Sequence, residues 1–155
     1  MSRAFVKEID DAPEPSLQDR PVSAAPNLVT KRGAELILAE IESLQRKLET
    51  LAGGEADEAR RDLRYWEARR ATMQIVERDP DTGAVGFGTE ITIRRAGRTQ
   101  TLRIVGEDEA DPRQGYLAYT APLARALEEA EAGETVEFEA GGRIDPIDIV
   151  SVKAI

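Results

Sequence analysis

The chain has 155 residues, of which one third are charged and 41% hydrophobic, and its net charge is −9. This size fits one ordinary domain or two small ones, and the composition is typical of a soluble globular protein. Cysteine and histidine are both absent, which excludes disulfides, thiolate chemistry, Ser-His triads and imidazole metal sites. The acidity argues against binding duplex DNA over the whole surface, because such binding needs a basic face.

Residues 1–29 contain four prolines and an acidic cluster, and they show no hydrophobic periodicity. We expect an extended, solvated tail, in which Ala4–Ile9 alternates weakly and could form an edge strand. Acidic residues stand where a signal peptide needs an apolar core, and no apolar run is long enough to cross a membrane. The sequence therefore predicts a cytoplasmic protein without membrane contact.

Residues 30–78 carry two apolar ladders on either side of Gly53-Gly54. In both ladders the residues recur at spacings of three and four, as in the seam of a coiled coil. The ladders consist of Ala34, Ile37, Ile41, Leu44, Leu48 and Leu51, and of Ala56, Ala59, Leu63, Trp66, Arg70 and Met73. The glycines allow the chain to reverse. The spacing predicts an antiparallel helical hairpin with Thr30 as its N-cap, helices over 30–51 and 55–74, and arms of roughly 30 Å.

Residues 79–155 begin with a turn at 79–83, after which the hydrophobic period becomes two. Strands are expected at 87–93, 101–105, 116–120, 135–139 and 147–152, and one helix over 122–131. Pro122 suits the first position of this helix, and Leu123 and Leu127 should fill the core. The predicted fold class is α+β, with a helical hairpin followed by an antiparallel sheet wrapped on one helix.

Several motifs resemble the GreA/GreB family of bacterial transcript cleavage factors. The C-terminal motifs are RIVGEDEADP at 103–112, Gly115, APLARAL at 121–127 and the Gly-Gly hairpin with its closing strand at 140–152. Residues 30–35 and 74–77 resemble the two ends of the family's coiled coil. The resemblance implies an FKBP-like C-terminal domain that docks on the rim of the RNA polymerase secondary channel. It also implies a coiled coil that enters the channel.

The hairpin tip departs from the family pattern. In cleavage factors an acidic GDLxEN-type loop at the tip helps to hold a catalytic magnesium ion, whereas residues 51–58 here are LAGGEADE. About forty residues separate Arg32 from Gln74, so each arm is shorter than the family's by roughly three turns, or about 16 Å. Metal ligands must lie within a few ångströms of the ion. The resemblance is therefore closer to the short-armed variant Rnk, which does not stimulate cleavage.

Two interpretations of the tip carboxylates Glu55, Asp57 and Glu58 stay open. They could hold Mg²⁺ in the polymerase active site, which would make the protein a true cleavage factor. The interpretation we favour is that they are first-turn acidic residues that interact with the helix dipole. On that reading the chain has no catalytic residue, needs no cofactor or metal of its own, and is not an enzyme.

The resemblance also implies a polymerase-contact surface on the acidic loop and at the start of the following helix. The candidate residues are Asp108, Glu109, Asp111, Thr120, Ala121, Pro122, Leu123 and Arg125. Pro122 and Leu123 would present an apolar patch, and the carboxylates would pair with basic side chains of the polymerase. The alternative is a solvated loop followed by an ordinary helix start.

Arginines of the second predicted helix form a third candidate group. Arg60, Arg61 and Arg64 could make a weak contact with RNA, and Arg69 and Arg70 are further members of the group. The alternative is a solvated face that makes i,i+4 pairs, with Glu40, Glu42 and Glu49 on the opposite arm as further partners. We expect Arg70 to reach from the seam toward the C-terminal domain, and Trp66 to be core rather than a stacking platform.

Two further functions are disfavoured. A prolyl isomerase needs a deep aromatic pocket, and residues 84–155 offer for one only Phe87, Tyr116, Tyr119 and Phe138. A coiled-coil adaptor would dimerise through the hairpin, but the Gly53-Gly54 turn favours pairing within one chain. We therefore expect a monomer.

Overall fold

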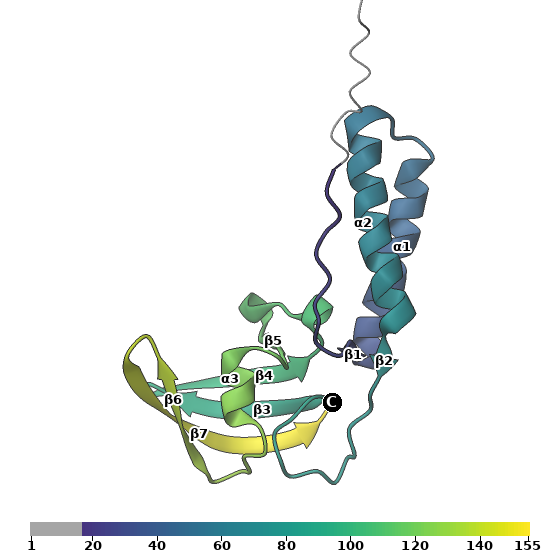
Figure 1. The fold of residues 1–155 in the computed structure, drawn as a ribbon. Coiled ribbons are helices and arrows are strands. Elements are labelled where there is room, and N and C mark those ends of the chain that lie inside the picture. The colour runs from purple at the N-terminus through teal and green to yellow at the C-terminus, as the bar shows by residue number, and fades with distance from the viewer. Residues whose placement is uncertain (1–16) are drawn as a thin grey trace, which may run out of the picture.

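A computed structural model describes residues 17–155, and in it a helical hairpin projects from a sheet domain (Figure 1). The α+β class predicted from the sequence is confirmed. The helices are α1 (Lys31–Leu48), α2 (Gly53–Thr72) and α3 (Pro122–Leu127). The strands are β1 (Leu28–Val29), β2 (Gln74–Ile75), β3 (Thr89–Arg95), β4 (Arg98–Val105), β5 (Tyr116–Ala118), β6 (Thr135–Ala140) and β7 (Arg143–Ala154). The candidate strand Ala4–Ile9 lies outside the described residues.

The hairpin begins at the predicted cap. Thr30 Oγ1 accepts a hydrogen bond from the Gly33 amide at 3.0 Å, which satisfies one of the free N–H groups at the start of α1. The chain reverses between Leu48 and Gly53. The first helix therefore ends before the predicted residue 51, and the second begins before the predicted residue 55. Gly53 has φ of 63°, a conformation that favours glycine.

The hairpin core follows the predicted seam at its base and middle. Val29, Ala34, Ile37 and Ile41 form a buried cluster, against which Leu63, Trp66 and Met73 pack. Trp66 therefore packs against the hairpin core, as expected. With 18 and 20 residues, α1 and α2 are about 27 and 30 Å long.

The sheet has the strand order β5-β4-β3-β7-β6. Its pairs are antiparallel except at one edge, where the short β5 runs parallel to β4. A parallel neighbour needs a crossover connection rather than a tight turn. Here residues 106–115 supply it through two 3₁₀ turns, η1 (Glu107–Glu109) and η2 (Pro112–Gln114).

The main core lies between the sheet and α3. The buried members are Val85, Ile91, Ile93, Leu102, Ile104, Ala124, Leu127, Ala130, Ile147 and Ile149. Leu127 fills this core as predicted, and Leu123 packs against it while staying half-buried.

The prediction that α3 continues to residue 131 is wrong. The helix ends at Leu127, and two backbone hydrogen bonds explain why. The Glu129 amide donates to the Val85 carbonyl at 2.9 Å, and the Val85 amide donates to the Ala130 carbonyl at 2.8 Å. The chain therefore leaves the helix to pair with the segment that precedes β3.

Residues 17–29, the described part of the N-terminal segment, lie along the hairpin (Figure 1). Its last two residues, Leu28 and Val29, form β1, which pairs in parallel with β2 at the exit of α2. In residues 17–155 no helix is both long and apolar enough to cross a membrane.

Candidate functional site

The acidic loop after β4 contacts the base of the hairpin. Arg69 of α2, whose side chain is only 2% exposed, donates through Nε to Asp108 Oδ2. Asp108 is itself 10% exposed, and its other oxygen accepts from the Tyr65 hydroxyl. Removing one partner of a pair this far from water would leave an uncompensated charge, so the hairpin and the sheet domain depend on each other at this contact.

A second contact of the loop is made by Glu109, whose side chain is 3% exposed. Its Oε2 accepts from Thr30 Oγ1 at 2.5 Å, and its Oε1 accepts from Arg32 Nη1 at 2.9 Å. The carboxylate thus sits at the N-terminus of α1, where the helix dipole favours a negative charge. A Cβ added to Gly33 would come within 2.8 Å of Glu109 Oε2, so the glycine leaves room for this contact.

Asn27, just before β1, completes the junction. Its Nδ2 donates to the Arg69 carbonyl at 2.8 Å and to Thr72 Oγ1 at 3.1 Å, and its Oδ1 accepts from Arg69 Nη2 at 2.8 Å. Burial, together with the hydrogen bond to Asp108, raises the pKa of Tyr65 to about 12. The phenol therefore stays protonated and able to donate. We call Asn27, Tyr65, Arg69, Asp108 and Glu109 the brace.

The brace changes the interpretation of the candidate partner residues. Asp108 and Glu109, predicted to face a partner, are engaged within the chain. Asp111 accepts from the Arg113 amide at 3.2 Å and caps η2. The residue that reaches the C-terminal domain is Arg69, whereas Arg70 is exposed, so the expectation for Arg70 is wrong.

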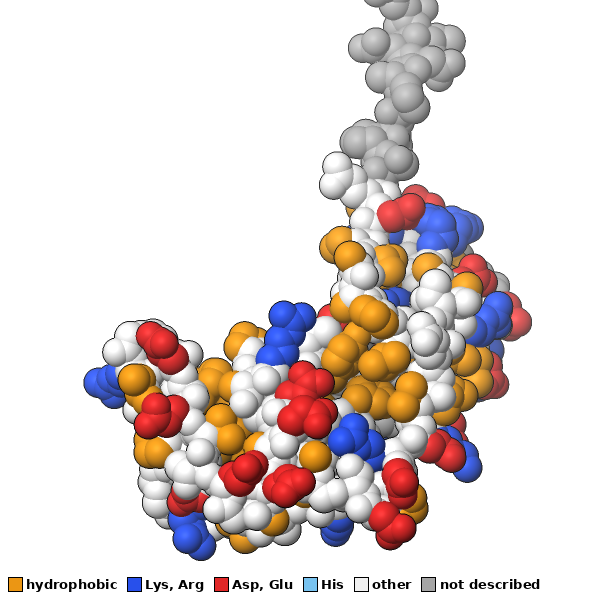
Figure 2. Space-filling model, turned by 60° about the horizontal axis from the view of Figure 1, so that its bottom comes forward, with side chains coloured by type: hydrophobic (Ala, Val, Ile, Leu, Met, Phe, Trp, Pro, Cys, Tyr) orange, Lys and Arg blue, Asp and Glu red, His pale blue; other side chains and the backbone are white. Residues whose placement is uncertain are grey.

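The remaining candidates lie together at the start of α3. Thr120 Oγ1 donates to Glu107 Oε1 at 2.9 Å, which ties this segment to the acidic loop. Ala121 is the N-cap of α3, Pro122 and Arg125 are exposed, and Leu123 is half-buried. We call Thr120–Arg125 the α3 patch. On the face drawn in Figure 2, hydrophobic side chains gather where the hairpin meets the sheet domain, with acidic and basic side chains beside them.

The tip carboxylates lie in the first turns of α2. Glu55, Asp57 and Glu58 are all exposed, and Asp57 accepts from Arg60 Nη1 at 2.9 Å. Across residues 17–155, no cluster of three acidic side chains is arranged to hold a metal ion.

The arginines of α2 pair along their own helix or with the N-terminal segment, so the part of the alternative that expected pairs with the opposite arm is wrong. Arg60 pairs with Asp57 and Arg61 with Asp62, both on the same helix, and Arg64 pairs with Asp19 of the N-terminal segment at 2.7 Å. On the other arm Glu42 pairs with Arg46 of its own helix. Side chains three or four residues apart are neighbours on a helix surface, which explains the pairs Arg60–Asp57 and Glu42–Arg46.

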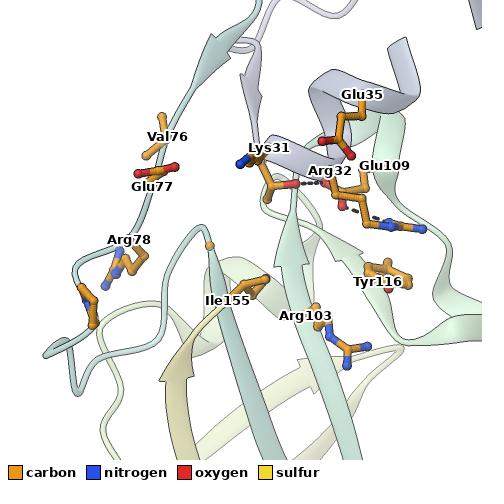
Figure 3. A pocket seen from close by; sticks show the side chains of 13 residues that line it. Lys31, Arg32, Glu35, Val76, Glu77, Arg78, Arg103, Glu109, Tyr116 and Ile155 are labelled. Carbon is orange, nitrogen blue, oxygen red and sulfur yellow. Dashed lines mark hydrogen bonds and ion pairs between the residues drawn. The ribbon is translucent and has the colours of Figure 1, made fainter. Parts of the chain in front are cut away.

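A cleft of about 660 Å³ lies between the base of the hairpin and the sheet (Figure 3). Sequence reasoning did not predict it, because its walls come from distant segments. Its arginines already have partners: Arg32 bonds to Glu109, Arg103 to Glu90 at 2.7 Å, and Arg78 to the Ala84 carbonyl at 3.0 Å. The three arginines of the cleft are therefore paired and do not form a free cluster of cations.

Known proteins resemble this chain over both domains. Residues 80–154 match the family model "Transcription elongation factor, GreA/GreB, C-term". A transcription elongation factor GreA from Verminephrobacter eiseniae is 32% identical over 152 aligned positions, which include 80% of this chain and 95% of that protein. A GreA from Neisseria meningitidis is 41% identical, but the match spans only 47% of this chain and 48% of the relative.

Solved structures of related proteins also match. A GreA/GreB factor from Nitrosomonas europaea is 23% identical, with 83% of this chain and 98% of that chain covered and a TM-score of 0.40. The GreA homologue Gfh1 from Thermus thermophilus is 13% identical, with 84% and 100% covered and a TM-score of 0.41. From the near full-length match to the Verminephrobacter protein, this chain belongs to the GreA/GreB family of transcription elongation factors.

Proposed function

We propose that this protein binds RNA polymerase at the rim of the secondary channel and places its short hairpin in the channel without stimulating RNA cleavage. Family membership is the observation that carries the choice of partner. The α3 patch is the proposed docking surface, because Pro122 and Arg125 are exposed beside the half-buried Leu123. Asp111 lies in the neighbouring loop and would contribute at the edge of the same surface.

The length of the hairpin supports the absence of cleavage. The arms are about 27 and 30 Å long, and the tip lacks the acidic loop of cleavage factors. The alignment with the Verminephrobacter GreA has 152 positions but takes in only 80% of the 155 residues here, so that relative has residues that this chain lacks. These observations favour the short-armed, Rnk-like variant.

A second candidate is a true cleavage factor. It is favoured by one observation, the three exposed carboxylates Glu55, Asp57 and Glu58 at the start of α2. Carboxylate oxygens are suitable Mg²⁺ ligands, and a magnesium site can combine them with groups from a partner. Against this reading, Asp57 is already paired with Arg60.

The proposal includes three further properties. Arg60, Arg61 and Arg64 make a weak contact with RNA near the polymerase. The protein is a monomer, because the apolar seam of each helix is buried against the other helix of the same chain. It acts in the cytoplasm, where bacterial transcription takes place.

Exchange of the docking arginine tests the proposal. We expect Arg125→Glu to weaken binding to core RNA polymerase roughly tenfold, since an interfacial charge is reversed. Arg143→Glu is the matched control, because Arg143 is also exposed but lies at the β6–β7 turn. Binding is measured by anisotropy of the labelled full chain. Equal weakening by both changes would reject the α3 patch, and no binding of the unmodified chain would reject the proposed function.

A further inference from the structure

Residues 17–25, which we call the strap, lie against α2 through two charged side chains. Asp19 Oδ1 accepts from Arg64 Nε at 2.8 Å and lies 2.7 Å from Arg64 Nη2. The guanidinium of Arg20 stacks on the ring of Tyr65, 3.9 Å from its centre, and lies 3.6 Å from Asp62. The strap therefore occupies one arginine and one aromatic face of α2.

The strap is held far less firmly than the residues that follow it. The paired side chains are exposed by 68% at Asp19 and 52% at Arg64, and charge pairs this exposed contribute little. In the described part of the chain, the polar contacts of the strap with α2 come only from Asp19 and Arg20. Asn27 and Val29, by contrast, are buried. Asn27 donates to the Arg69 carbonyl, and the Val29 carbonyl accepts from the Val76 amide. The strap can thus leave α2, exposing the face of Tyr65, while Asn27 and Val29 keep their contacts.

The covered surface has the chemistry of a single-stranded nucleic acid site. Arg64 offers a guanidinium to an anion, and Tyr65 offers a ring face that Trp66 holds edge-on at 5.1 Å. Phosphates pair with arginine, and bases stack on aromatic faces whatever their sequence. We propose that the strap is a displaceable cover of a single-stranded RNA site on α2, in which a phosphate replaces Asp19 on Arg64 and a base replaces Arg20 on Tyr65.

The stacking position selects RNA over an acidic protein segment. A segment whose only charged groups are carboxylates would replace Asp19 but would leave the face of Tyr65 without a flat partner. RNA replaces both contacts at once. The inference rests on the proposed RNA contact of Arg60, Arg61 and Arg64, and it adds Tyr65 to that contact. It also adds a means of regulation. RNA can bind only when the strap is open, so the strap lowers the apparent affinity for RNA.

The test compares RNA binding by the full chain and by Asp19→Asn. The probe is a short fluorescent oligo-uridine, titrated at low ionic strength because phosphate contacts weaken with salt. We expect Asp19→Asn to bind up to about fivefold more tightly, as removal of one exposed charge pair opens the strap. Asp81→Asn makes the same change in net charge at an exposed turn outside the strap, and we expect it to bind like the unmodified chain.

Trp66 provides a second readout, since it is the only tryptophan and Arg20 lies 5.7 Å from its ring centre. We expect RNA to shift its emission in the unmodified chain, and this shift to be smaller in Arg20→Gln, where the stacked cation is already gone. Equal RNA binding by the unmodified chain and Asp19→Asn would overturn the proposed role of the strap as a cover. The proposed RNA contact of α2 would remain. Absence of RNA binding in every variant would overturn both. If polyglutamate shifts the Trp66 emission as readily as RNA does, the surface would be assigned to an acidic protein instead.

Discussion

At the scale of single residues, Arg69 has the most demanding environment. It is buried against Asp108 and Asn27, so its removal leaves a carboxylate in the junction without its counter-charge. We expect Arg69→Met to lower the free energy of unfolding by roughly 3–5 kcal/mol. Urea denaturation measures this loss. Arg70→Met, at the exposed neighbour, should change it by less than about 0.5 kcal/mol, and similar losses in the two variants would contradict the brace.

Tyr65 gives the junction a dependence on alkaline pH. Its pKa is raised from 10.0 to about 12 by burial and by the hydrogen bond to Asp108. A raised pKa stabilises the folded state fully below pH 10, and this contribution is lost as the pH rises through 12. We expect the stability advantage of the unmodified chain over Tyr65→Phe to shrink between these values. A constant difference in thermal unfolding across that range would argue against the assignment.

The pattern of spacings could not choose between Arg69 and Arg70. They follow Trp66 by three and four residues, and both spacings fit one stripe of a helix. Arg69 is the buried one because it pairs with Asp108, which lies 39 residues further along the chain. Glu109 and its partner Thr30 are 79 residues apart. Short-range periodicity carries no information on such contacts, and the expectation that the acidic loop faces a partner came from the family resemblance.

At the scale of elements, the sequence predicted both hairpin helices, all five sheet strands and α3. Their periodicities are strong because each element buries one face, and a buried face leaves a regular pattern. The ends were less predictable. α3 stops at Leu127 because the chain pairs with Val85, and β5 runs parallel because two 3₁₀ turns form the crossover. Both outcomes depend on residues outside the element concerned.

Gly106 lies where η1 meets β1. A Cβ added there would lie 2.4 Å from the Leu28 carbonyl oxygen, which is backbone and cannot rotate away. We expect Gly106→Ala to cost about 1–3 kcal/mol of stability, as overpacking does. It should also speed hydrogen exchange of the Val76 amide, which donates to the Val29 carbonyl at 3.0 Å.

Gly54→Ala is the control for this change. Gly54 lies in α2 with no atom within 4 Å of an added Cβ and without a positive φ, so alanine should be neutral or stabilising by up to about 1 kcal/mol. Unchanged exchange at Val76 in Gly106→Ala would show that β1 and η1 are not in contact in solution.

At the scale of the whole molecule, the brace and the β1-β2 pair join the hairpin to the sheet domain at several points. The direction of the hairpin is therefore fixed relative to the α3 patch. On the proposed docking, the length of the arms then determines how far the tip extends into the channel. The strap adds a segment whose removal alters the surface of α2 without altering this reach.

The most direct test of the proposed function is RNA cleavage in a backtracked elongation complex. The full chain is added at concentrations that saturate its binding to the polymerase, with a cleavage-stimulating family member as positive control. We predict that the transcript keeps its length, and that the chain inhibits the positive control by competing for the channel. Shortening of the transcript by this chain, abolished by the double change Asp57→Ala and Glu58→Ala, would contradict the account and identify a true cleavage factor.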